Sequence, residues 1–409
     1  MHKVRTDDRH EAAKAAANKK AALGPDVDLQ AFATEVDEHK YLKDPSKLPA
    51  ADKENMLKAG VMVDDLGERS GTYIQKDLTP VHFSTSQEGV EVMSLSRALE
   101  THGWLKDYMW KAVKVDTDKY TAQLELHGSD GYFIRSLPGA KTILPVQACL
   151  YLDHKDLAQR VHNIIIAEEG SELHIITGCS THPLGSGIHI GVSEFYIKRG
   201  AKLTFSMIHN WAPDVEVRPR SVSIIEEDAV FLSNYIAMKP MRTLQMYPTA
   251  RCVGPNATVR FNSVLVALPN SLLDVGSRVI LDAKGCRAEI ISRTISLGGD
   301  IIARGDIQGN APDVKGHLEC RGLLLSEKGM IHAIPELIGR VPGVDLSHEA
   351  AVGKIAEEEV EYLMARGLTR DEATAMIVRG FLKVDIEGLP PMLEAELKKA
   401  IEQSEKEIF

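Results

Sequence analysis

Cysteine is scarce in this sequence, which has five in 409 residues and no Cys-x-x-Cys pair. An odd, scattered set does not describe a disulfide framework or a structural zinc site, and most such thiols are buried small hydrophobic groups. Aromatic residues make up only 5% of the chain, too few to favour a surface that stacks on sugar rings. The longest apolar runs, such as 264–268, are far too short to cross a bilayer.

Net positive charge is also missing, because the formal net charge is −10. Phosphate groups bind to a cationic face, so this charge argues against nucleic acid and against an acidic membrane as partners. Residues 1–8 lack the apolar core of a signal peptide. With 44% apolar and 26% charged residues, we expect a globular cytoplasmic protein with two or three domains and a large core.

The first part of the chain has helical patterns separated by irregular segments. Residues 8–23 are rich in Ala, Lys and Glu and stop at a Gly-Pro pair, a usual helix terminator. Further helical spacing occurs over 52–60 and 94–113. We therefore expect an N-terminal domain of helices and loops over residues 1–115.

The middle of the chain contains a repeated turn. Six four-residue segments share one pattern, whose second member is Gly, Asp or Asn, the residues that most easily take a positive φ. The steps between these second members are 31, 30, 28, 28 and 29 residues, which indicates stacked structural units. The six residues are Gly139, Gly170, Gly200, Asp228, Asn256 and Gly285.

The segments between these turns are short and β-branched, as in Val161-His-Asn-Ile-Ile-Ile-Ala, and predict strands rather than paired helices. The step is too short for a propeller blade, and the Leu/Asn lattice of a leucine-rich repeat is missing. A mainly β fold with one solenoid rung per repeat, over residues 116–345, is the architecture that we expect. A β-sandwich with evenly spaced turns is the alternative.

After about residue 345 the apolar spacing becomes helical. The pattern predicts helices over 357–366 and 373–379, followed by a last charged helix. The apolar stripe of that last helix consists of Leu393, Leu397 and Ile401. We expect residues 346–409 to form a C-terminal helical domain, which caps the open last rung, docks a partner, or does both.

A thiol, an imidazole and a carboxylate gather at this junction, in Cys320, His348 and Glu349. Iron is the metal that this mixed set of soft and harder ligands suits best. Because 348 lies 28 residues after 320, the three side chains are expected to stack on neighbouring rungs. Adjacent residues of a strand point to opposite faces, so His348 and Glu349 need not bind the same atom. A buried core thiol is the plainer interpretation of Cys320.

Cys179 lies in a polar segment close to His182. A neighbouring imidazole lowers the pKa of a thiol and makes it a sulfur nucleophile, whereas a purely structural thiol is the alternative. Residues 139–142 resemble the end of a Walker A motif but lack its upstream glycine and its spacing. We expect no nucleotide to bind this chain.

Together these motifs resemble the SufB/SufD family, the scaffold proteins of the SUF iron–sulfur cluster assembly system. The similarity runs over about 130–400, and 346–381 is its most specific part. The motifs are the Gly178-Cys179 loop, His209-Asn210-Trp211, Cys320, His332-Ala-Ile-Pro335, Ser347-His348-Glu349-Ala350 and the run from Gly367 to Phe381.

The resemblance implies a right-handed parallel β-helix flanked by N-terminal and C-terminal helical domains. It implies a scaffold rather than an enzyme, with ATP hydrolysis supplied by a SufC-like ABC ATPase that docks on the C-terminal helices. The implied cofactor is a transient iron–sulfur cluster. A second SufB/SufD-type subunit, a sulfur donor and apo-protein acceptors are the further partners that it implies.

The resemblance also implies roles for single residues. In SufB, the residues that match Cys320 and Glu349 are associated with building the nascent cluster. The cysteine that matches Cys179 is associated with sulfur uptake, from which persulfide sulfur moves along the β-helix interior. SufD members have Gly after the residue that matches His348, so Glu349 makes this chain similar to SufB.

The chain also departs from typical SufB members. It is shorter and has fewer cysteines, so it is interpreted as a minimal form that acts as a homodimer. Ser-Thr-His follows Cys179 where SufB usually has Thr-Ala-Pro, and a supply of free sulfide would make a relay through Cys179 unnecessary.

Two other classes stay open. A cytosolic β-helix enzyme acting on carbohydrate or acyl groups would retain such a ligand and no iron. A metal-free structural subunit that docks the ATPase would tolerate the loss of Cys320.

Overall fold

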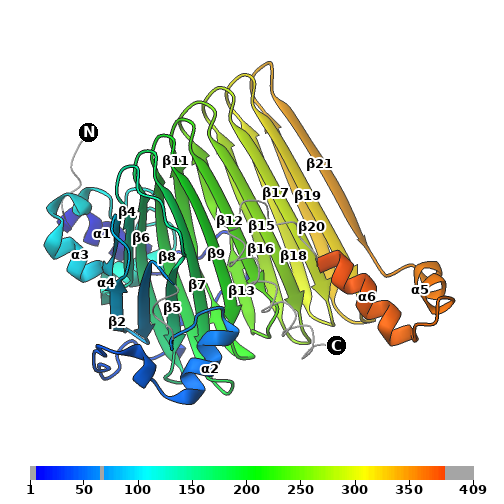
Figure 1. Ribbon diagram of the computed structural model, residues 1–409, viewed down its shortest axis with the longest axis horizontal. Helices are drawn as coiled ribbons and strands as arrows, with labels where there is room; N and C mark the ends of the chain where they lie inside the picture. Colours follow the sequence, from blue (N-terminus) through cyan, green and yellow to red (C-terminus); the bar gives the residue numbers. More distant parts are fainter. Residues whose placement is uncertain (1–5, 65–68, 383–409) are drawn as a thin grey trace.

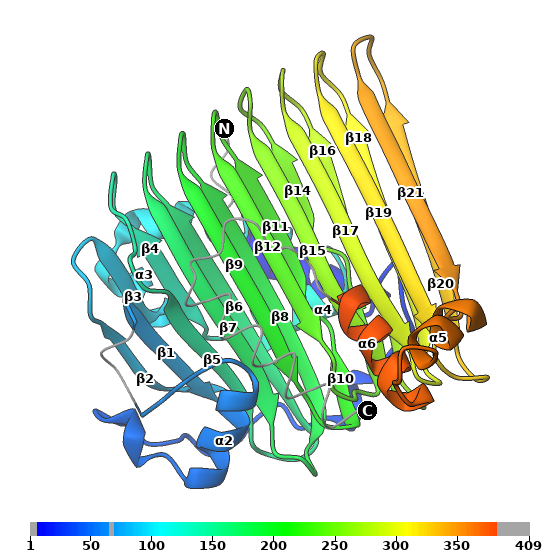
Figure 2. The ribbon, with the colours of Figure 1, turned by 45° about the vertical axis from the view of Figure 1, so that its right-hand side comes forward.

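The computed structural model describes residues 6–64 and 69–382. Two long sheets face each other and are built from successive rungs, so that the chain forms an elongated parallel β-helix (Figures 1 and 2). The pairs β1–β2 and β3–β4 are antiparallel, and the pairs between successive rungs are parallel. The predicted solenoid is confirmed, and a β-sandwich is not what the chain forms.

The first sheet follows one spatial order from the N-terminal to the C-terminal rungs. Its strands are β2 (Thr79–Thr85), β1 (Gly71–Lys76), β5 (Val146–Leu152), β7 (Glu172–Thr181), β9 (Lys202–Asn210), β12 (Val230–Ala237), β15 (Thr258–Ala267), β17 (Arg287–Ser296), β19 (Lys315–Leu324) and β21 (Asp345–Gly353).

The second sheet covers the other side of the core, and in two of its rungs the strand is divided into two short pieces. Its strands are β3 (Val90–Ser94), β4 (Tyr132–Ser136), β6 (Leu157–Ala167), β8 (Ser186–Ile197), β10 (Asp214–Val217) with β11 (Arg220–Ile225), β13 (Thr243–Met246) with β14 (Thr249–Cys252), β16 (Leu272–Leu281), β18 (Asp300–Gly309) and β20 (Met330–Gly339).

The repeated turns have the backbone geometry that their residue types predict. All six predicted residues have a positive φ, between 54° and 72°. Asp313 and Gly343, at φ 60° and 83°, continue the series by two further rungs. The turns also stack on one another, since the amide of Gly170 donates to the carbonyl of Arg199 in the next turn, at 3.0 Å. The regular step in the sequence is therefore the number of residues in one rung.

Side chains alternate between the solenoid interior and its outer surface. On β19 the even-numbered residues 316–322 are buried, whereas Lys315 and Arg321 are exposed. The inward side chains of both sheets merge into one long apolar core that extends from Tyr73 to Cys320. Because the strands are parallel and in register, each interior position stacks in a column with its equivalents on neighbouring rungs.

Helices and strands both occur before residue 116. The helices are α1 (Thr6–Ala16), α2 (Ala50–Lys58) and α3 (Leu95–Thr101), with the 3-10 turns η1 (Leu29–Ala31), η2 (Pro45–Lys47) and η4 (Gly103–Asp107). Strands β1, β2 and β3 belong to the two sheets, so the solenoid begins well before the boundary expected at residue 116. Helix α4 (Lys119–His127) then packs against β6 and β8.

The C-terminal helical part begins later than expected. Strand β21 continues the first sheet across residues 345 and 346, and α5 (Glu357–Met364) is the first helix after it, followed by α6 (Arg370–Leu382). The expected last helix, with Leu393, Leu397 and Ile401, lies outside the described residues. None of the helices among the described residues has both the length and the apolar character of a membrane span.

Candidate functional site

Cys320 lies near the C-terminal end of the solenoid, with its thiol on the interior face of β19. Its side chain belongs to the apolar core and only 2% of the residue is exposed. The register places it between Ser292 of β17 and Ala350 of β21. Burial, with a smaller effect of the Glu319 carboxylate, raises the pKa of the thiol to about 11. A metal ion that binds here must therefore displace a proton from sulfur.

His348 lies on β21, on the same face as Cys320 but not directly beside it. It pairs with Leu318, whose side chain is buried in the solenoid core. The expected stacking of 348 on 320 is wrong, because β19 and β21 are related by a step of 30 residues rather than 28. His348 is nevertheless a histidine on the interior face of β21, and it is exposed.

Glu349 points away from Cys320, on the outer face of the sheet. It pairs with Glu319, and Arg321 links the two carboxylates, at 2.7 Å to Glu319 and 3.1 Å to Glu349. Arg293 of the preceding rung contacts Glu319 at 2.5 Å. Two arginines therefore neutralise two stacked glutamates on the outer surface. The Glu349 carboxylate is thus already ion-paired with Arg321 of the same chain.

The three predicted residues therefore do not form a closed metal site in one chain. Cys320 and His348 share the interior face, and Glu349 lies on the opposite one. Within residues 6–64 and 69–382, the one compact group of three or more His, Cys, Asp and Glu ligands lies elsewhere. A thiol and an imidazole at one end of a solenoid offer part of a coordination shell, and no described residue of the chain completes that shell.

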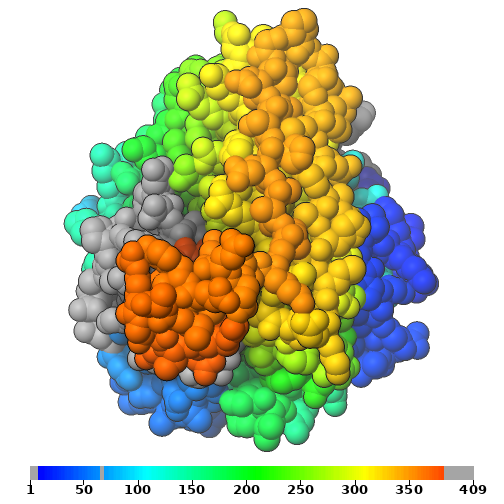
Figure 3. All heavy atoms as spheres, turned by 90° about the vertical axis from the view of Figure 1, so that its right-hand side faces the viewer, coloured from blue at the N-terminus to red at the C-terminus, as the bar shows by residue number. Residues whose placement is uncertain are grey.

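The last rung leaves this end of the solenoid open. Strands β20 and β21 are the last in their sheets, and each pairs with a described strand on one side only. Figure 3 looks onto this end, where β21 crosses the face and the α5–α6 helices lie beside it. Val352, next to Ala350 on the interior face of β21, is 42% exposed. The polar and apolar side chains of this rung are therefore accessible to another molecule.

Cys179 lies on β7, several rungs before Cys320, and its thiol is fully buried in the same core. Burial, followed by the effect of Cys149, raises the pKa of Cys179 well above its ordinary value. His182 is exposed, and its Nδ1 accepts the amide of Leu184 at 3.2 Å. The expectation that His182 lowers the pKa of this thiol is wrong, because desolvation dominates at Cys179.

Polar side chains occupy the interior between the two cysteines. Cys179 pairs with His209, whose Nδ1 lies 2.8 Å from the hydroxyl of Tyr235. Tyr235 pairs with Ser263, and the Ser263 hydroxyl donates to Ser292 at 3.1 Å. Ser292 then pairs with Cys320. We call these four residues (His209, Tyr235, Ser263 and Ser292) the polar row.

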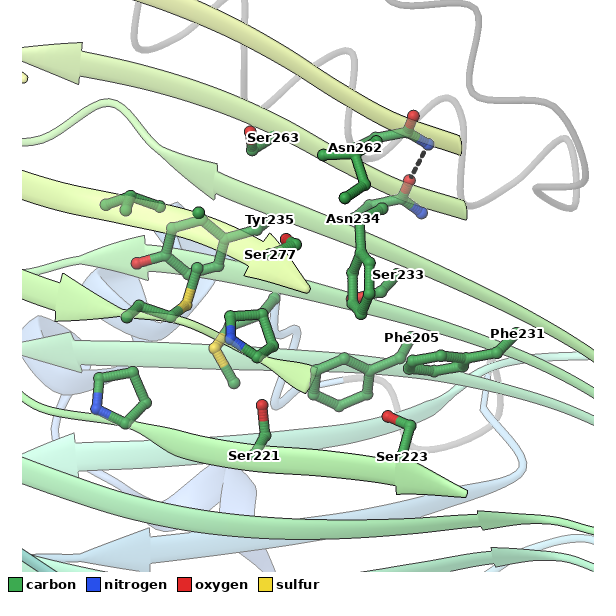
Figure 4. Close-up of a pocket in the computed structure, with 18 of the residues that line it drawn as sticks. Phe205, Ser221, Ser223, Phe231, Ser233, Asn234, Tyr235, Asn262, Ser263 and Ser277 are labelled. Atoms are coloured by element: carbon green, nitrogen blue, oxygen red, sulfur yellow. Dashed lines mark hydrogen bonds between the residues drawn. The ribbon is translucent and has the colours of Figure 1, made fainter. Parts of the chain in front are cut away.

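Three residues of the polar row, Tyr235, Ser263 and Ser292, line a cavity of about 60 Å³ inside the solenoid. Its lining includes Ser221, Ser233, Tyr235, Ser263, Ser277 and Ser292, and Figure 4 shows several of these hydroxyl groups around the space. A cavity needs only about 10–15 Å³ of accessible space to hold one water molecule. The space is therefore large enough for a few water molecules or for a small sulfur species.

His209 is the titratable member of the polar row. Burial, followed by the effect of His189, lowers the pKa of His209 well below its ordinary value, so the imidazole is neutral. Its Nε2 has no hydrogen-bond partner among the described residues, although the atom is buried. The unpaired ring nitrogen is available to form a hydrogen bond with a small polar species in the interior.

Sequence reasoning missed the polar row, although a signal for it exists. Tyr235, Ser263, Ser292 and Cys320 follow one another at steps of 28, 29 and 28, which match the steps of the turns. A search for polar residues at the rung spacing would have found this column. The strand pairing is needed to place its members on the interior face.

Comparisons with known proteins show which family this chain is similar to. Residues 150–381 match the family model described as SUF system FeS cluster assembly, SufBD core domain. An iron–sulfur cluster assembly SufBD family protein of Methanothermobacter thermautotrophicus (strain Winter) is 51% identical over 96% of this chain and 98% of its own length. One from Archaeoglobus fulgidus is 55% identical over 88% of this chain and 96% of its own length. The iron–sulfur cluster assembly protein SufB of Bacillus subtilis is 27% identical over 87% of this chain and 78% of its own length.

Proposed function

The chain belongs to the SufBD family of iron–sulfur cluster assembly proteins, and from this premise we propose that it is a SufB-like scaffold subunit. A nascent cluster is built at the C-terminal end of its solenoid, in the cytoplasm, and is passed on to apo-proteins. The chain itself binds no nucleotide, and a SufC-like ABC ATPase supplies ATP hydrolysis.

The position of Cys320 is the observation that carries this proposal. The thiol lies at one end of the polar row and one rung from the open end of the solenoid. Iron–sulfur clusters are commonly held by four thiolates, whereas a scaffold has to release what it builds. One thiolate, with His348 on the same face, gives a site that holds a cluster only while further ligands are present.

Sulfur reaches Cys320 through the interior in this proposal. It is supplied by a sulfur donor at the Cys179 end, either directly as sulfide or as a persulfide on Cys179. An external thiol reductant then releases the outer sulfur of that persulfide as sulfide, and the two electrons come from oxidation of the reductant to its disulfide. The polar row supports this route because its hydroxyl groups and the unpaired Nε2 of His209 offer hydrogen bonds to a desolvated sulfur species. Since Cys179 is fully buried, its loading requires the surrounding rungs to open.

The α5–α6 pair is the surface that we assign to the ATPase. Tyr362, Met364 and Met376 are exposed there, a concentration of large apolar side chains on two short helices. Tyr362→Asp and Met376→Asp are each expected to weaken binding of a SufC-like ATPase at least about 10-fold, because buried aromatic and apolar anchors carry most of the energy of an interface. Isothermal titration calorimetry measures the change.

Ile143→Asp is the matched control for the docking variants, since Ile143 is an exposed apolar residue far from α5–α6 in the chain. Its affinity for the ATPase should equal that of the wild type. Equal affinity in all the variants would place the ATPase on another surface.

A second copy of the chain completes the site in this proposal, with the open ends of two solenoids facing each other. Val352→Asp places a charge on the interior face of the last rung, where burial in a dimer would cost several kcal/mol without a partner for the charge. We expect the dimer dissociation constant to rise at least about 10-fold, as measured by sedimentation velocity over a concentration series. An unchanged monomer–dimer equilibrium would contradict this assignment.

The ATPase acts on this interface by differential binding. Its nucleotide-bound state has to bind one arrangement of the two scaffold subunits more tightly than the other, because a partner shifts an equilibrium only by that difference. Opening of the ends would admit iron and expose Cys320, and closing would assemble the ligands around them.

A further inference from the structure

Four side chains with metal-binding groups meet at the N-terminal rungs, at the opposite end of the solenoid from Cys320. They are His39, Asp77, Asp153 and His154, and one ligand atom of each lies within 4.8 Å of the ligand atoms of the others. We call them the His/Asp cluster. Only Asp153 and His154 are neighbours in the sequence, and neither the proposed cluster assembly nor the polar row uses any of the four.

The strand pairing brings three of the four together. Strands β1 and β5 are parallel neighbours, and Lys76 at the end of β1 pairs with Tyr151 near the end of β5. The residues that follow these ends, Asp77 on one strand and Asp153 with His154 on the other, therefore emerge at the same edge of the sheet.

His39 is added by the loop between η1 and η2. The amide of His39 donates to the Thr79 hydroxyl at 3.3 Å, and the amide of Leu42 donates to the carbonyl of Val81 at 2.7 Å. These bonds fix the loop against β2 and direct the imidazole of His39 to Asp77. The cluster thus joins the N-terminal segment to the first rungs of the solenoid.

Asp77 is the rigid centre of the cluster. Its φ is 53°, and its side chain is fully buried. One carboxylate oxygen accepts the backbone amides of Asp153 at 2.7 Å and His154 at 3.1 Å. The other lies 2.8 Å from Nε2 of His39 and 2.5 Å from Nδ1 of His154. Two imidazole nitrogens therefore converge on a single preorganised carboxylate oxygen.

The surrounding charges favour a divalent cation. Lys76 contacts Asp52 at 2.8 Å and Asp153 at 2.9 Å, so it orients the Asp153 carboxylate from behind. Three carboxylates and one ammonium group leave a local net charge of −2 when the imidazoles are neutral. The side chain of His154 is 48% exposed, which gives an ion access from solvent. Outer partners of this kind commonly orient metal ligands.

We propose that His39, Asp77, Asp153 and His154 bind a divalent transition-metal ion of the Zn²⁺ or Fe²⁺ type. Imidazole nitrogen and carboxylate oxygen are the donors that such ions share, and a set of four suits tetrahedral coordination. On binding, the ion takes the place of the protons that link the imidazoles to Asp77. It acts as a structural clip that stabilises the attachment of the N-terminal loop to the solenoid.

Co²⁺ is the probe for this site, because its visible spectrum reports its ligands. The full chain, freed of metal with a chelator, should bind one Co²⁺ with the visible bands of a nitrogen and oxygen site and without a thiolate charge-transfer band. Cys320→Ser should give the same spectrum, which separates this site from the cluster site. Wild-type protein that binds no Co²⁺, or binds it only with a thiolate band that Cys320→Ser removes, would overturn the proposal.

Single-ligand variants assign the ion to the cluster. His39→Ala and His154→Ala should each weaken Co²⁺ binding at least about 10-fold, the lower limit seen when even outer-shell partners are lost. His127→Ala is the control, because His127 is an exposed histidine outside the cluster. Binding to both cluster variants as tight as to the wild type would overturn the assignment.

A thermal measurement distinguishes a metal clip from a purely hydrogen-bonded cluster. Excess Zn²⁺ should raise the melting temperature of the wild type, because a ligand that binds the folded state alone stabilises it. The increase should vanish in His154→Ala and persist in His154→Cys, which restores a zinc ligand at an accessible position. Equal shifts for the wild type and His154→Ala would mean that Zn²⁺ binds elsewhere, and would contradict the proposal.

Discussion

Cys320→Ser is expected to abolish cluster assembly while leaving the fold intact. After anaerobic reconstitution with iron and sulfide in the presence of the ATPase, the variant should retain almost no iron or acid-labile sulfide. Serine lacks the soft sulfur ligand that iron–sulfur chemistry requires. The new hydroxyl group lies beside Ser292 in the register, which offers it a hydrogen-bond partner and limits the cost of its burial.

Cys252→Ala is the matched control for this substitution. Cys252 is a fully buried cysteine of the same core, and it lies on β14 in the opposite sheet. This variant should assemble as much cluster as the wild type. A Cys320→Ser protein that folds, binds its partner and retains the same iron and sulfide would support the metal-free docking role instead.

Glu194→Ala is expected to destabilise the protein by about 3–5 kcal/mol, the range for removing one partner from a buried charged network. The Glu194 side chain on β8 is fully buried and lies 2.9 Å from Nε2 of His162. It also accepts the amides of Trp110 at 2.6 Å, Ala112 at 2.6 Å and Val113 at 3.1 Å. Without the carboxylate, the buried amide of Val113 and the partly buried amides of Trp110 and Ala112 lose their acceptor. An unsatisfied buried group costs about 1–3 kcal/mol.

Native-state hydrogen exchange measures this effect locally, so it does not depend on two-state unfolding of the whole chain. The amides of Trp110, Ala112 and Val113 should lose their protection in Glu194→Ala. Glu169→Ala is the control, because its side chain is 57% exposed and pairs with an exposed arginine. Surface pairs of this kind contribute at most about 1 kcal/mol. Retained protection in Glu194→Ala would show that this carboxylate does not hold the segment in place.

The solenoid could be predicted because its turns restrict the residues that fit them. A positive φ selects Gly, Asn and Asp at one position of every rung, so the step survives even where the strands have little in common. Asp313 and Gly343 continue the same pattern. Counting these two turns would have extended the predicted solenoid beyond residue 345, to β21.

Strand β21 itself lacks the alternation of a half-buried strand. Its outer edge pairs with no further rung within the described residues, and most of its residues are exposed. One interior position holds a polar residue, His348, where β19 has Leu318. The N-terminal strands β1, β2 and β3 were missed for a related reason, because they precede the repeating turns and pair partly in antiparallel fashion.

Part of the candidate site followed from the sequence and part did not. The alternation of strand residues predicts that His348 and Glu349 point to opposite faces, and the register shows that they do. The length of the last step, 30 instead of 28 residues, could have been counted from Asp313 to Gly343, and this count would have paired residue 348 with 318 instead of 320. The His/Asp cluster was out of reach, because His39 and Asp77 meet only through the docking of a loop on the folded sheet.

The Mössbauer spectrum of the ⁵⁷Fe-reconstituted complex of scaffold and ATPase is the measurement that tests cluster assembly at Cys320 most directly. We predict a cluster spectrum with inequivalent iron sites in the wild type, at least one of them bearing a nitrogen or oxygen ligand. Cys320→Ser in the same intact complex should show only unassembled iron. The same cluster spectrum in both proteins would contradict the account, because the cluster would then form without the thiol of Cys320.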